Sequence, residues 1–194
     1  MKTKLILSLA VILFCSIILS CSSEKPAPPA GGSSVDKVLA PPPTEKTVKS
    51  TDGTCQVTIP YNWSEETTLN KDAKLQVSMR MRDAFLVVFV DQKDKYGDIN
   101  LEGFAQGANK KLVKRLTSPE GAAGVSLTVG GLPAIQYQLT GKASGSTSAY
   151  IQTLIEGPIY FYEILAWTPR MQAERNRSLF EEAIKSFKEI TPQQ

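Results

Sequence analysis

The chain contains no histidine, and this absence limits the chemistry that the protein can perform. Histidine is the commonest general base and the commonest metal ligand in proteins. No nucleophile motif and no pair of carboxylates at a recognisable spacing takes its place. The sequence therefore predicts a protein that is not an enzyme and that uses no metal ion or cofactor.

Cysteine is also scarce, and its three positions are Cys15, Cys21 and Cys55. Because the first two lie in or beside an N-terminal apolar segment, only Cys55 remains for the rest of the chain. An intramolecular disulfide framework is therefore excluded, and the core has to be stabilised by packing. Cys55 shares the apolar side of an alternating segment with Val57 and Ile59. This position predicts a buried, structural thiol.

The chain lacks an apolar run that is long enough to cross a bilayer. Its longest run, Leu5 to Leu19, has about fifteen residues, whereas a spanning helix needs roughly 20. Lys2 and Lys4 precede the run, as in an export signal. Residues 18–21 end it and resemble the bacterial lipobox, in which signal peptidase cuts before a lipid-modified cysteine. We therefore expect residues 1–20 to be a lipoprotein signal peptide.

Lipid modification of Cys21 has consequences for location and partners. Two acyl chains anchor a protein stably, so the mature chain is expected to bind a membrane through its N-terminal lipid. The expected location is the cell envelope. Ser22 follows Cys21 in place of the aspartate that often retains lipoproteins in the inner membrane. We therefore expect an outer-membrane lipoprotein that faces the periplasm.

Neither sign of charge dominates the mature chain. The full sequence has 22 Lys and Arg residues against 19 Asp and Glu residues. Loss of Lys2 and Lys4 with the signal peptide leaves 20 basic against 19 acidic residues. A chain so close to neutral is not expected to bind nucleic acid.

Composition divides the mature chain into a tether and one domain. Residues 21–50 are rich in proline, alanine and serine and contain too few apolar residues to offset the entropy of ordering. We expect a disordered tether there. Residues 51–194 are sufficient for a single globular domain with its own core.

Hydrophobic periodicity in the domain predicts strands followed by helices. Helical spacing over 101–116, with Asn100 as N-cap, predicts one helix. A second helix is predicted from Thr168-Pro169 to Lys188, with a later start at Ser178 as the alternative. Alternation or continuous apolar character predicts strands over 55–60, 75–81, 84–90, 125–129, 135–139, 149–155 and 159–167. This order predicts an α+β domain, a single mainly antiparallel sheet flanked by helices.

Several groups of side chains are candidates for a functional site. Lys110, Lys111, Lys114 and Arg115 form a concentrated basic group at the end of the first helix. They are a candidate partner surface, and the alternative is a solvated face whose cations stabilise the helix dipole. Asp91, Asp94 and Asp98 lack the spacing and the terminal glutamate of a calcium loop. Glu163 is the acidic residue in an otherwise apolar strand, and the two alternatives are a carboxyl group with a raised pKa that marks a site and one that points into the solvated end of the sheet.

Two further patterns concern packing. Met79 and Met81 alternate with Arg80 and Arg82, so both methionines are expected in the core. Gly103 and Gly107 lie four residues apart on one helix face, which predicts a close approach of that helix to the sheet.

Four short segments carry a resemblance to a known family. Residues 57–63 (VTIPYNW), 100–104 (NLEGF), 130–134 (GGLPA) and 184–188 (IKSFK) occur in this order. Together they resemble the PsbP-like family, which includes DcrB-like bacterial lipoproteins and the photosystem II extrinsic subunit. The resemblance covers about residues 54–190 and implies an α/β/α sandwich that binds other proteins. Because the chain lacks histidine and has a predicted lipid anchor, metal retention and photosystem binding are not carried over.

The leading hypothesis is a non-enzymatic, membrane-tethered module that binds or assembles an envelope protein. The alternative is a carrier that holds an apolar small ligand between sheet and helix. Its expected lining is Met79, Met81, Phe104 and Trp167.

Overall fold

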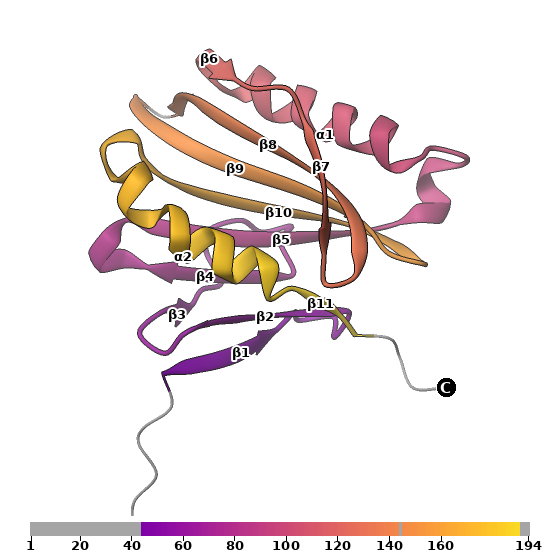
Figure 1. Ribbon diagram of the computed structural model, residues 1–194, viewed down its shortest axis with the longest axis horizontal. Coiled ribbons are helices and arrows are strands. Elements are labelled where there is room, and N and C mark those ends of the chain that lie inside the picture. The colour runs from indigo at the N-terminus through magenta and orange to yellow at the C-terminus, as the bar shows by residue number, and fades with distance from the viewer. Residues whose placement is uncertain (1–43, 144, 191–194) are drawn as a thin grey trace, which may run out of the picture. The chain divides into compact units, whose positions relative to one another are not determined.

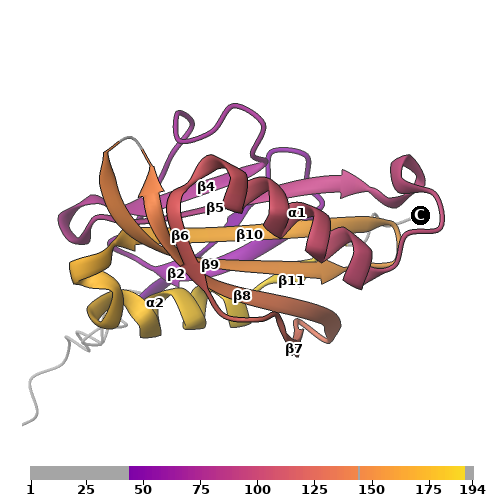
Figure 2. The same ribbon diagram turned by 90° about the horizontal axis from the view of Figure 1, so that it is seen from above.

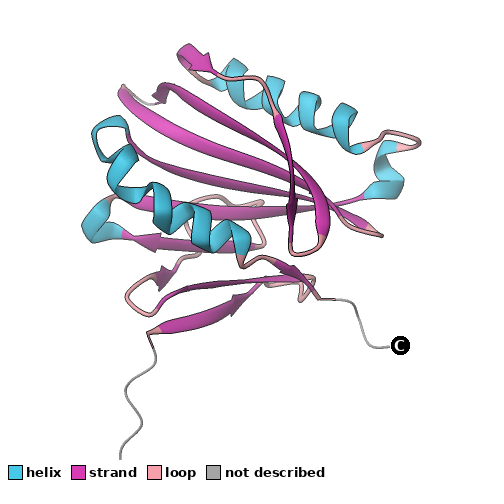
Figure 3. Ribbon diagram, viewed as in Figure 1, coloured by secondary structure: helices cyan, strands magenta, loops and turns pink. Residues whose placement is uncertain are grey.

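The protein is described here by a computed structural model that covers residues 44–143 and 145–190. These residues form two antiparallel sheets and two α-helices in stacked layers (Figures 1 and 3). The predicted signal peptide, Cys21 and most of the predicted tether lie outside the described residues. Within the described ranges, no helix combines the length and the apolar character needed to cross a bilayer.

The larger sheet has eight strands in the order β3-β4-β5-β10-β9-β8-β6, and β7 pairs with β8 as well. All of its pairings are antiparallel. Its strands are β3 (Ser64–Glu65), β4 (Leu75–Met79), β5 (Ala84–Gln92), β6 (Thr117–Gly121), β7 (Val125–Val129), β8 (Leu132–Ala143), β9 (Ser146–Glu156) and β10 (Tyr160–Pro169). The long central strands β5, β10 and β9 are covered on both faces, which explains their continuous apolar runs.

Alternation along the central strands supplies two cores, one on each face of the large sheet. Leu154 and Phe161 point to the face covered by helix α1 (Leu101–Arg115). Their neighbours Ile155 and Tyr162 point to the face covered by helix α2 (Ala173–Lys185). The two helices therefore lie on opposite sides of the sheet (Figure 2). The expected N-cap of α1 is confirmed, since Asn100 Oδ1 accepts the Gly103 N–H at 2.9 Å.

The second sheet has three strands in the order β1-β2-β11 and packs on the α2 side of the molecule. These strands are β1 (Glu45–Lys49), β2 (Cys55–Pro60) and β11 (Lys188–Glu189). The predicted α+β class, with mainly antiparallel strands flanked by helices, is confirmed. The sequence had predicted one sheet, whereas β1 and β11 add partners to β2 in a second one.

Strand β1 also corrects the predicted boundary between tether and domain. The tether was expected to end at residue 50, but Glu45 to Lys49 pair along β2 in full register. Val48 is buried at 4% exposure in the core beneath α2. The segment was missed because one buried valine among charged residues carries almost no periodic signal.

The strand predicted over 75–81 ends earlier, at Met79. Residues Arg80–Arg82 form a 3₁₀ turn, η1, and Asp83 adopts a left-handed conformation with φ of 48° that leads into β5. The turn breaks the alternation, so Met81 is 98% exposed and its predicted core position is wrong. Met79 is buried, as predicted.

The last helix starts later and ends earlier than predicted. Thr168 and Pro169 continue β10 because they pair with Ala149 and Ser148 of β9. A 3₁₀ turn, η3 (Arg170–Gln172), follows before α2 begins at Ala173. The alternative start is also wrong, since Ser178 lies inside α2. The helix ends at Lys185, and β11 then pairs with β2.

Candidate binding groove

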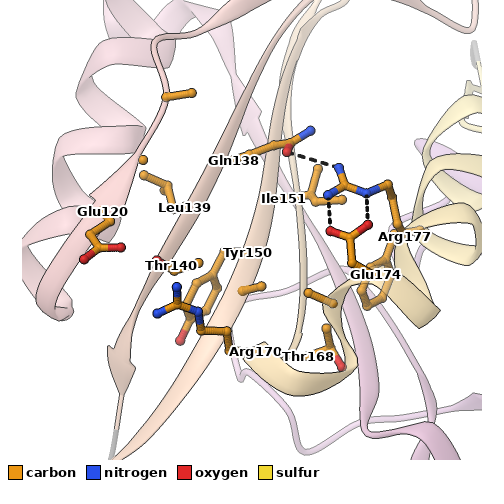
Figure 4. A pocket seen from close by; sticks show the side chains of 15 residues that line it. Glu120, Gln138, Leu139, Thr140, Tyr150, Ile151, Thr168, Arg170, Glu174 and Arg177 are labelled. Carbon is orange, nitrogen blue, oxygen red and sulfur yellow. Dashed lines mark hydrogen bonds and ion pairs between the residues drawn. The ribbon is translucent and has the colours of Figure 1, made fainter.

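A groove of about 460 Å³ lies on the α2 face of the large sheet (Figure 4). Strands β8 and β9 form its floor, α2 and η3 form one wall, and the end of β6 with the next residue forms the other. Its lining residues are Glu120, Gly121, Ala122, Gln138, Leu139, Thr140, Ala149, Tyr150, Ile151, Thr168, Arg170, Ala173, Glu174, Arg177 and Phe180. We call this feature the α2 groove.

Small side chains on the floor leave the volume open. Thr140 pairs with Ala149, and Gln138 pairs with Ile151, so these four residues share the groove face of the sheet. Thr140 and Ala149 are short, so they leave a space above this part of the sheet. On the opposite wall, Gly121 permits β6 to lie close on β8, because a Cβ atom there would overlap the Leu139 side chain.

The α2 wall supplies an apolar surface and an arginine that crosses the groove. Phe180 and Ala173 contribute the apolar part. Arg177 Nη1 donates to Gln138 Oε1 at 3.3 Å, and its Nη2 donates to Glu174 Oε1 at 2.6 Å (Figure 4). The hydrogen bond from Arg177 to Glu174 lowers the pKa of the Glu174 carboxyl group. Arg177 therefore links α2 to β8 through Gln138.

Arg170 lies on η3 and also lines the groove (Figure 4). Its side chain is exposed and has no ion pair or hydrogen bond to any residue in the described part of the chain. Glu120 stands on the other wall. The groove thus combines apolar side chains with charged residues of both signs, as in a site that orients a ligand by a few polar contacts.

The polar side chains of the groove are hydroxyls, carboxylates, arginines and one amide. Its hydroxyl side chains, Thr140, Thr168 and Tyr150, have no histidine beside them because the sequence contains none. The carboxylate of Glu174 is bound to Arg177. The arrangement is suited to binding.

The pocket predicted from sequence is wrong, since the structure does not bring its four residues together. Met79 is in the core beneath α2, whereas Phe104 is in the core beneath α1, on the opposite face of the sheet. Met81 is exposed, and Trp167 stacks on Phe85 with ring centroids 5.4 Å apart. Sequence reasoning missed Arg170, Arg177 and Gln138, because no local pattern indicates that α2 and β8 come together.

Glu163 occupies a second, smaller pocket of about 80 Å³ beneath α1. Burial raises the pKa of its carboxyl group, and Gln152 Nε2 donates a hydrogen bond to Glu163 Oε1 at 2.6 Å. Asp91, Tyr96 and Lys111 also line the pocket. Of the two alternatives from sequence, the raised pKa is confirmed in direction. The groups around Glu163 were not predictable because they come from four other elements.

The glycines of α1 border this pocket and do not behave alike. A Cβ atom on Gly103 would overlap the Ile99 side chain, so glycine is required by close packing there. Gly107 has no neighbour within 4 Å of such an atom and faces open space. The predicted close approach of the helix to the sheet is therefore wrong at both positions, because Gly103 meets the residue before its own helix and Gly107 meets nothing.

The four predicted basic residues stay together at the end of α1, but they divide between two directions. Lys111 lines the Glu163 pocket, and the charges of Lys111 and Arg115 both lower the pKa of Glu163. Lys110 and Lys114 are exposed, one turn apart on α1. None of the four has an ion pair with another described residue. They remain a candidate partner surface.

Two further predictions concern cysteine and metal. Cys55 is fully buried, and burial raises the pKa of its thiol to about 11, so it is unreactive at neutral pH. Its predicted structural position is confirmed. Within the described ranges, no group of three or more His, Cys, Asp or Glu side chains is placed to hold a metal ion, and Asp91, Asp94 and Asp98 are included in that statement.

No family model matches the chain, and no curated protein matches it either. Solved structures do. LpqN of Mycobacterium tuberculosis, described as involved in cell envelope biogenesis, is 16% identical over 76% of this chain and 91% of its own, with a TM-score of 0.57. The cyanobacterial PsbP protein of Synechocystis is 12% identical over 76% and 93%, with a TM-score of 0.56.

A third likeness is to Mog1p of Saccharomyces cerevisiae, a Ran-binding protein. It is 14% identical over 74% of this chain and 94% of its own, with a TM-score of 0.53. At such low identity these likenesses concern the fold. They show that the described domain has a PsbP-like α+β fold.

Proposed function

We propose that the protein is a non-enzymatic binding module of the cell envelope and that the α2 groove is its binding site. The groove is the observation that carries the proposal. It is already open, and apolar side chains line it together with charged residues on its walls. Known ligand sites often combine apolar surface with a few polar groups in this way.

The location of the module is inferred from the N-terminal sequence. Residues 18–21 supply the lipobox-like signal, and Cys21 would carry the lipid that anchors the mature chain. Ser22 favours the outer membrane, with the domain facing the periplasm. The likeness to LpqN, a protein described as involved in cell envelope biogenesis, supports an envelope role.

The proposed partner is an envelope protein. Mog1p, described as Ran-binding, shows that this fold is used to bind a protein. The groove also favours a second candidate function, a carrier of an apolar small ligand. Its volume of about 460 Å³ lies in the range of small-molecule sites, and Ile151 and Phe180 supply apolar contacts.

Site-specific photo-crosslinking in intact cells tests the groove and separates the two candidates. A photo-reactive residue at Gln138 or Thr140 lies in the groove, and one at Gln106 lies on the exposed side of α1 as the matched control. A protein partner gives the same large adduct from both groove positions and none from position 106. A small ligand gives only a small mass increase at the groove positions. No adduct, or equal adducts at all three positions, contradicts the proposal.

The lipid anchor has a separate test. Cys21→Ser removes the proposed lipid site, so the variant is expected to lose incorporation of a labelled lipid precursor and to leave the membrane fraction. A normally processed, membrane-bound variant contradicts the anchor. Density-gradient separation of the two membranes of the wild-type cells then tests the outer-membrane placement.

A further inference from the structure

Five large apolar side chains are exposed in the described part of the chain, and Met81, Met171 and Tyr61 are three of them. Met81 and Met171 are each 98% exposed, and Tyr61 is 62% exposed. The two methionines occupy the middle positions of the 3₁₀ turns η1 and η3. A methionine side chain that is almost completely exposed at a turn leaves its whole apolar surface in water.

The three side chains belong to one end of the large sheet. Phe85 of β5 pairs with Trp167 of β10, so the turns η1 and η3, which adjoin these strands, are neighbours. Asn176 on α2 joins η1 to the end of β10 just before η3, because its Nδ2 donates to the Arg82 carbonyl oxygen and to Thr168 Oγ1, both at 2.9 Å. Tyr61 reaches the same end because it leads into β3, where Ser64 pairs with Ser78 just before η1.

The chain also enters the domain at this end. The Tyr61 N–H donates to the carbonyl oxygen of Thr44, the first described residue, at 2.9 Å. Figure 1 shows the start of β1, η1 and η3 on the same side of the molecule. The 43 residues before Thr44, which include Cys21, are therefore joined to the domain at the end that carries η1 and η3.

The charged neighbours of the methionines suit a phospholipid surface. Arg82 and Arg170 flank Met81 and Met171 in the chain, and neither guanidinium has an ion pair in the described part of the protein. Arg80 is different because it is bound to Glu66 at 2.8 Å. Acidic residues are present too, since Asp83 lies next to Arg82. Guanidinium groups bind phosphate through paired N–H donors, so the two unpaired arginines match lipid headgroups.

We propose that this end of the sheet, formed by Tyr61, Met81, Arg82, Arg170 and Met171, is a membrane-facing surface. The methionine side chains enter the headgroup region of the bilayer, the two arginines bind lipid phosphates, and Tyr61 lies at the interface as amphipathic aromatic residues do. The inference rests on the proposed anchor at Cys21, which holds the domain near the bilayer. Because a tether raises the local concentration of the surface, a weak interaction is sufficient.

Methionine oxidation measures this contact directly in the assembled system. A chain that begins at Cys21 keeps every described residue and is coupled through its Cys21 thiol to a maleimide headgroup lipid. The vesicles contain phosphatidylethanolamine and phosphatidylglycerol. Cys55 does not compete, since it is buried with a pKa of about 11. Hydrogen peroxide converts accessible methionine to the sulfoxide, which mass spectrometry quantifies at each position.

The matched control places a methionine at the other end of the sheet. Ile159 is 53% exposed and precedes Tyr160 at the opposite end of β10, so Ile159→Met adds an exposed methionine away from the proposed surface. On vesicles, oxidation of Met81 and Met171 is expected to slow several-fold relative to the uncoupled chain, with no change at position 159. Met79, which is buried, oxidises slowly in both states.

Two results of the oxidation experiment would contradict a membrane contact at this surface. Unchanged oxidation rates of Met81 and Met171 on vesicles, or equal slowing of oxidation at position 159, overturn the proposal. Slowing in the uncoupled chain that depends on protein concentration indicates a second copy of the chain and also overturns it. Arg82→Gln combined with Arg170→Gln is expected to reduce the protection on vesicles while the unfolding midpoint stays the same.

Because the coupling supplies the tether chemically, this experiment is independent of natural lipidation. Failure of the Cys21→Ser test removes the anchor proposal, whereas failure of the oxidation test removes the membrane-facing surface alone.

Discussion

Glu163 is a partly buried acid whose ionised form destabilises the fold. Its carboxylate accepts one strong hydrogen bond from Gln152, but burial raises the pKa and nearby Asp91 raises it further. The positive charges of Lys111 and Arg115 act in the opposite direction without reversing the shift. At neutral pH the ionised group therefore destabilises the folded state relative to the unfolded chain, where the carboxylate is solvated.

Glu163→Gln is expected to raise the free energy of unfolding at neutral pH. A carboxyl group with a raised folded pKa binds more protons in the folded state, so its penalty is complete above the folded pKa. The penalty decreases as the pH falls through that pKa and disappears below the unfolded value. The gain from Glu163→Gln should therefore be present at pH 7 and lost in acid. Urea unfolding at both pH values measures it.

The exposed residue Glu182 on α2 supplies the control, and Glu182→Gln is expected to change little at either pH. If Glu163→Gln lowers the stability at neutral pH, the carboxylate is instead stabilised by Lys111 and Gln152.

At the residue scale, the burial of a side chain was predictable where the alternation of its own strand determines it. It was not predictable where a turn or a neighbouring element determines it. Cys55, Val57 and Ile59 are all fully buried, as their alternation predicts. Met81 is exposed because the 3₁₀ turn η1 (Arg80–Arg82) ends the alternation at Met79. The position of Arg177 above Gln138 depends on how α2 lies on the sheet, and no local sequence pattern records that.

At the scale of elements, the turn between β7 and β8 shows how one glycine position differs from the next. Gly130 and Gly131 both have positive φ, at 59° and 84°. A Cβ atom on Gly130 would fall on the Phe187 carbonyl oxygen, whereas Gly131 has nothing within 4 Å. Of the two glycines, Gly130 is therefore the one that packs against Phe187, between α2 and β11.

Gly130→Ala is expected to be more destabilising than Gly131→Ala. Both substitutions place a Cβ atom in the left-handed region, which costs about 1 kcal/mol. The clash with the Phe187 backbone should raise the cost at Gly130 to about 2 kcal/mol or more. Thermal or urea unfolding of both variants gives the difference. Equal losses would indicate that the hairpin moves away from α2 without cost.

Strand β1 leads to a prediction about the domain boundary. Val48 is buried, and Ser50 Oγ accepts the N–H groups of Thr54 and Cys55 at 3.0 Å. A chain that begins at Thr51 loses both features, whereas one that begins at Pro41 keeps them. Burial of a valine side chain is worth about 1.5–3 kcal/mol, so the shorter chain is expected to be at least about 2 kcal/mol less stable. Equal unfolding midpoints would contradict a structural part for β1.

The predicted ends of helices and strands were wrong where strand pairing, and not the local sequence, determines where an element begins or ends. The type of nearly every long element was predictable from period-two or helical spacing. Thr168-Pro169 has the local signature of a helix start, but β9 is long enough to pair with both residues and extends β10. Glu45 to Lys49 form a strand only because β2 is available beside them.

At the scale of the whole molecule, the layers were predictable but the groove was not. Two amphipathic helices and a set of alternating strands are sufficient to predict helices that cover a sheet. The α2 groove depends on two further facts, the place where β6 joins β8 and the side of the sheet taken by α2. Both are tertiary, so the site residues Arg170 and Gln138 had no signal in the sequence.

The basic end of α1 leads to a prediction about how the molecule meets its partner. Lys110 and Lys114 are the members of the group that can be changed without affecting Glu163, because Lys111 and Arg115 provide its nearby positive charge. Exposed charges act over several ångströms and mainly affect the rate of association. Lys110→Glu combined with Lys114→Glu is therefore expected to slow association with a negatively charged partner by roughly tenfold at low salt.

The control variant applies the same change in net charge elsewhere. Lys49 and Lys71 are exposed and lie outside α1 and the α2 groove, so Lys49→Glu with Lys71→Glu should slow association much less. The partner protein is the one identified by photo-crosslinking at position 138. Its rate of association with each variant is measured at low and high salt. The difference between them should shrink as salt screens the charges. If both variants behave alike, net charge alone explains the effect. If neither changes the rate, the lysines form a solvated face, and recognition depends on contacts within the groove.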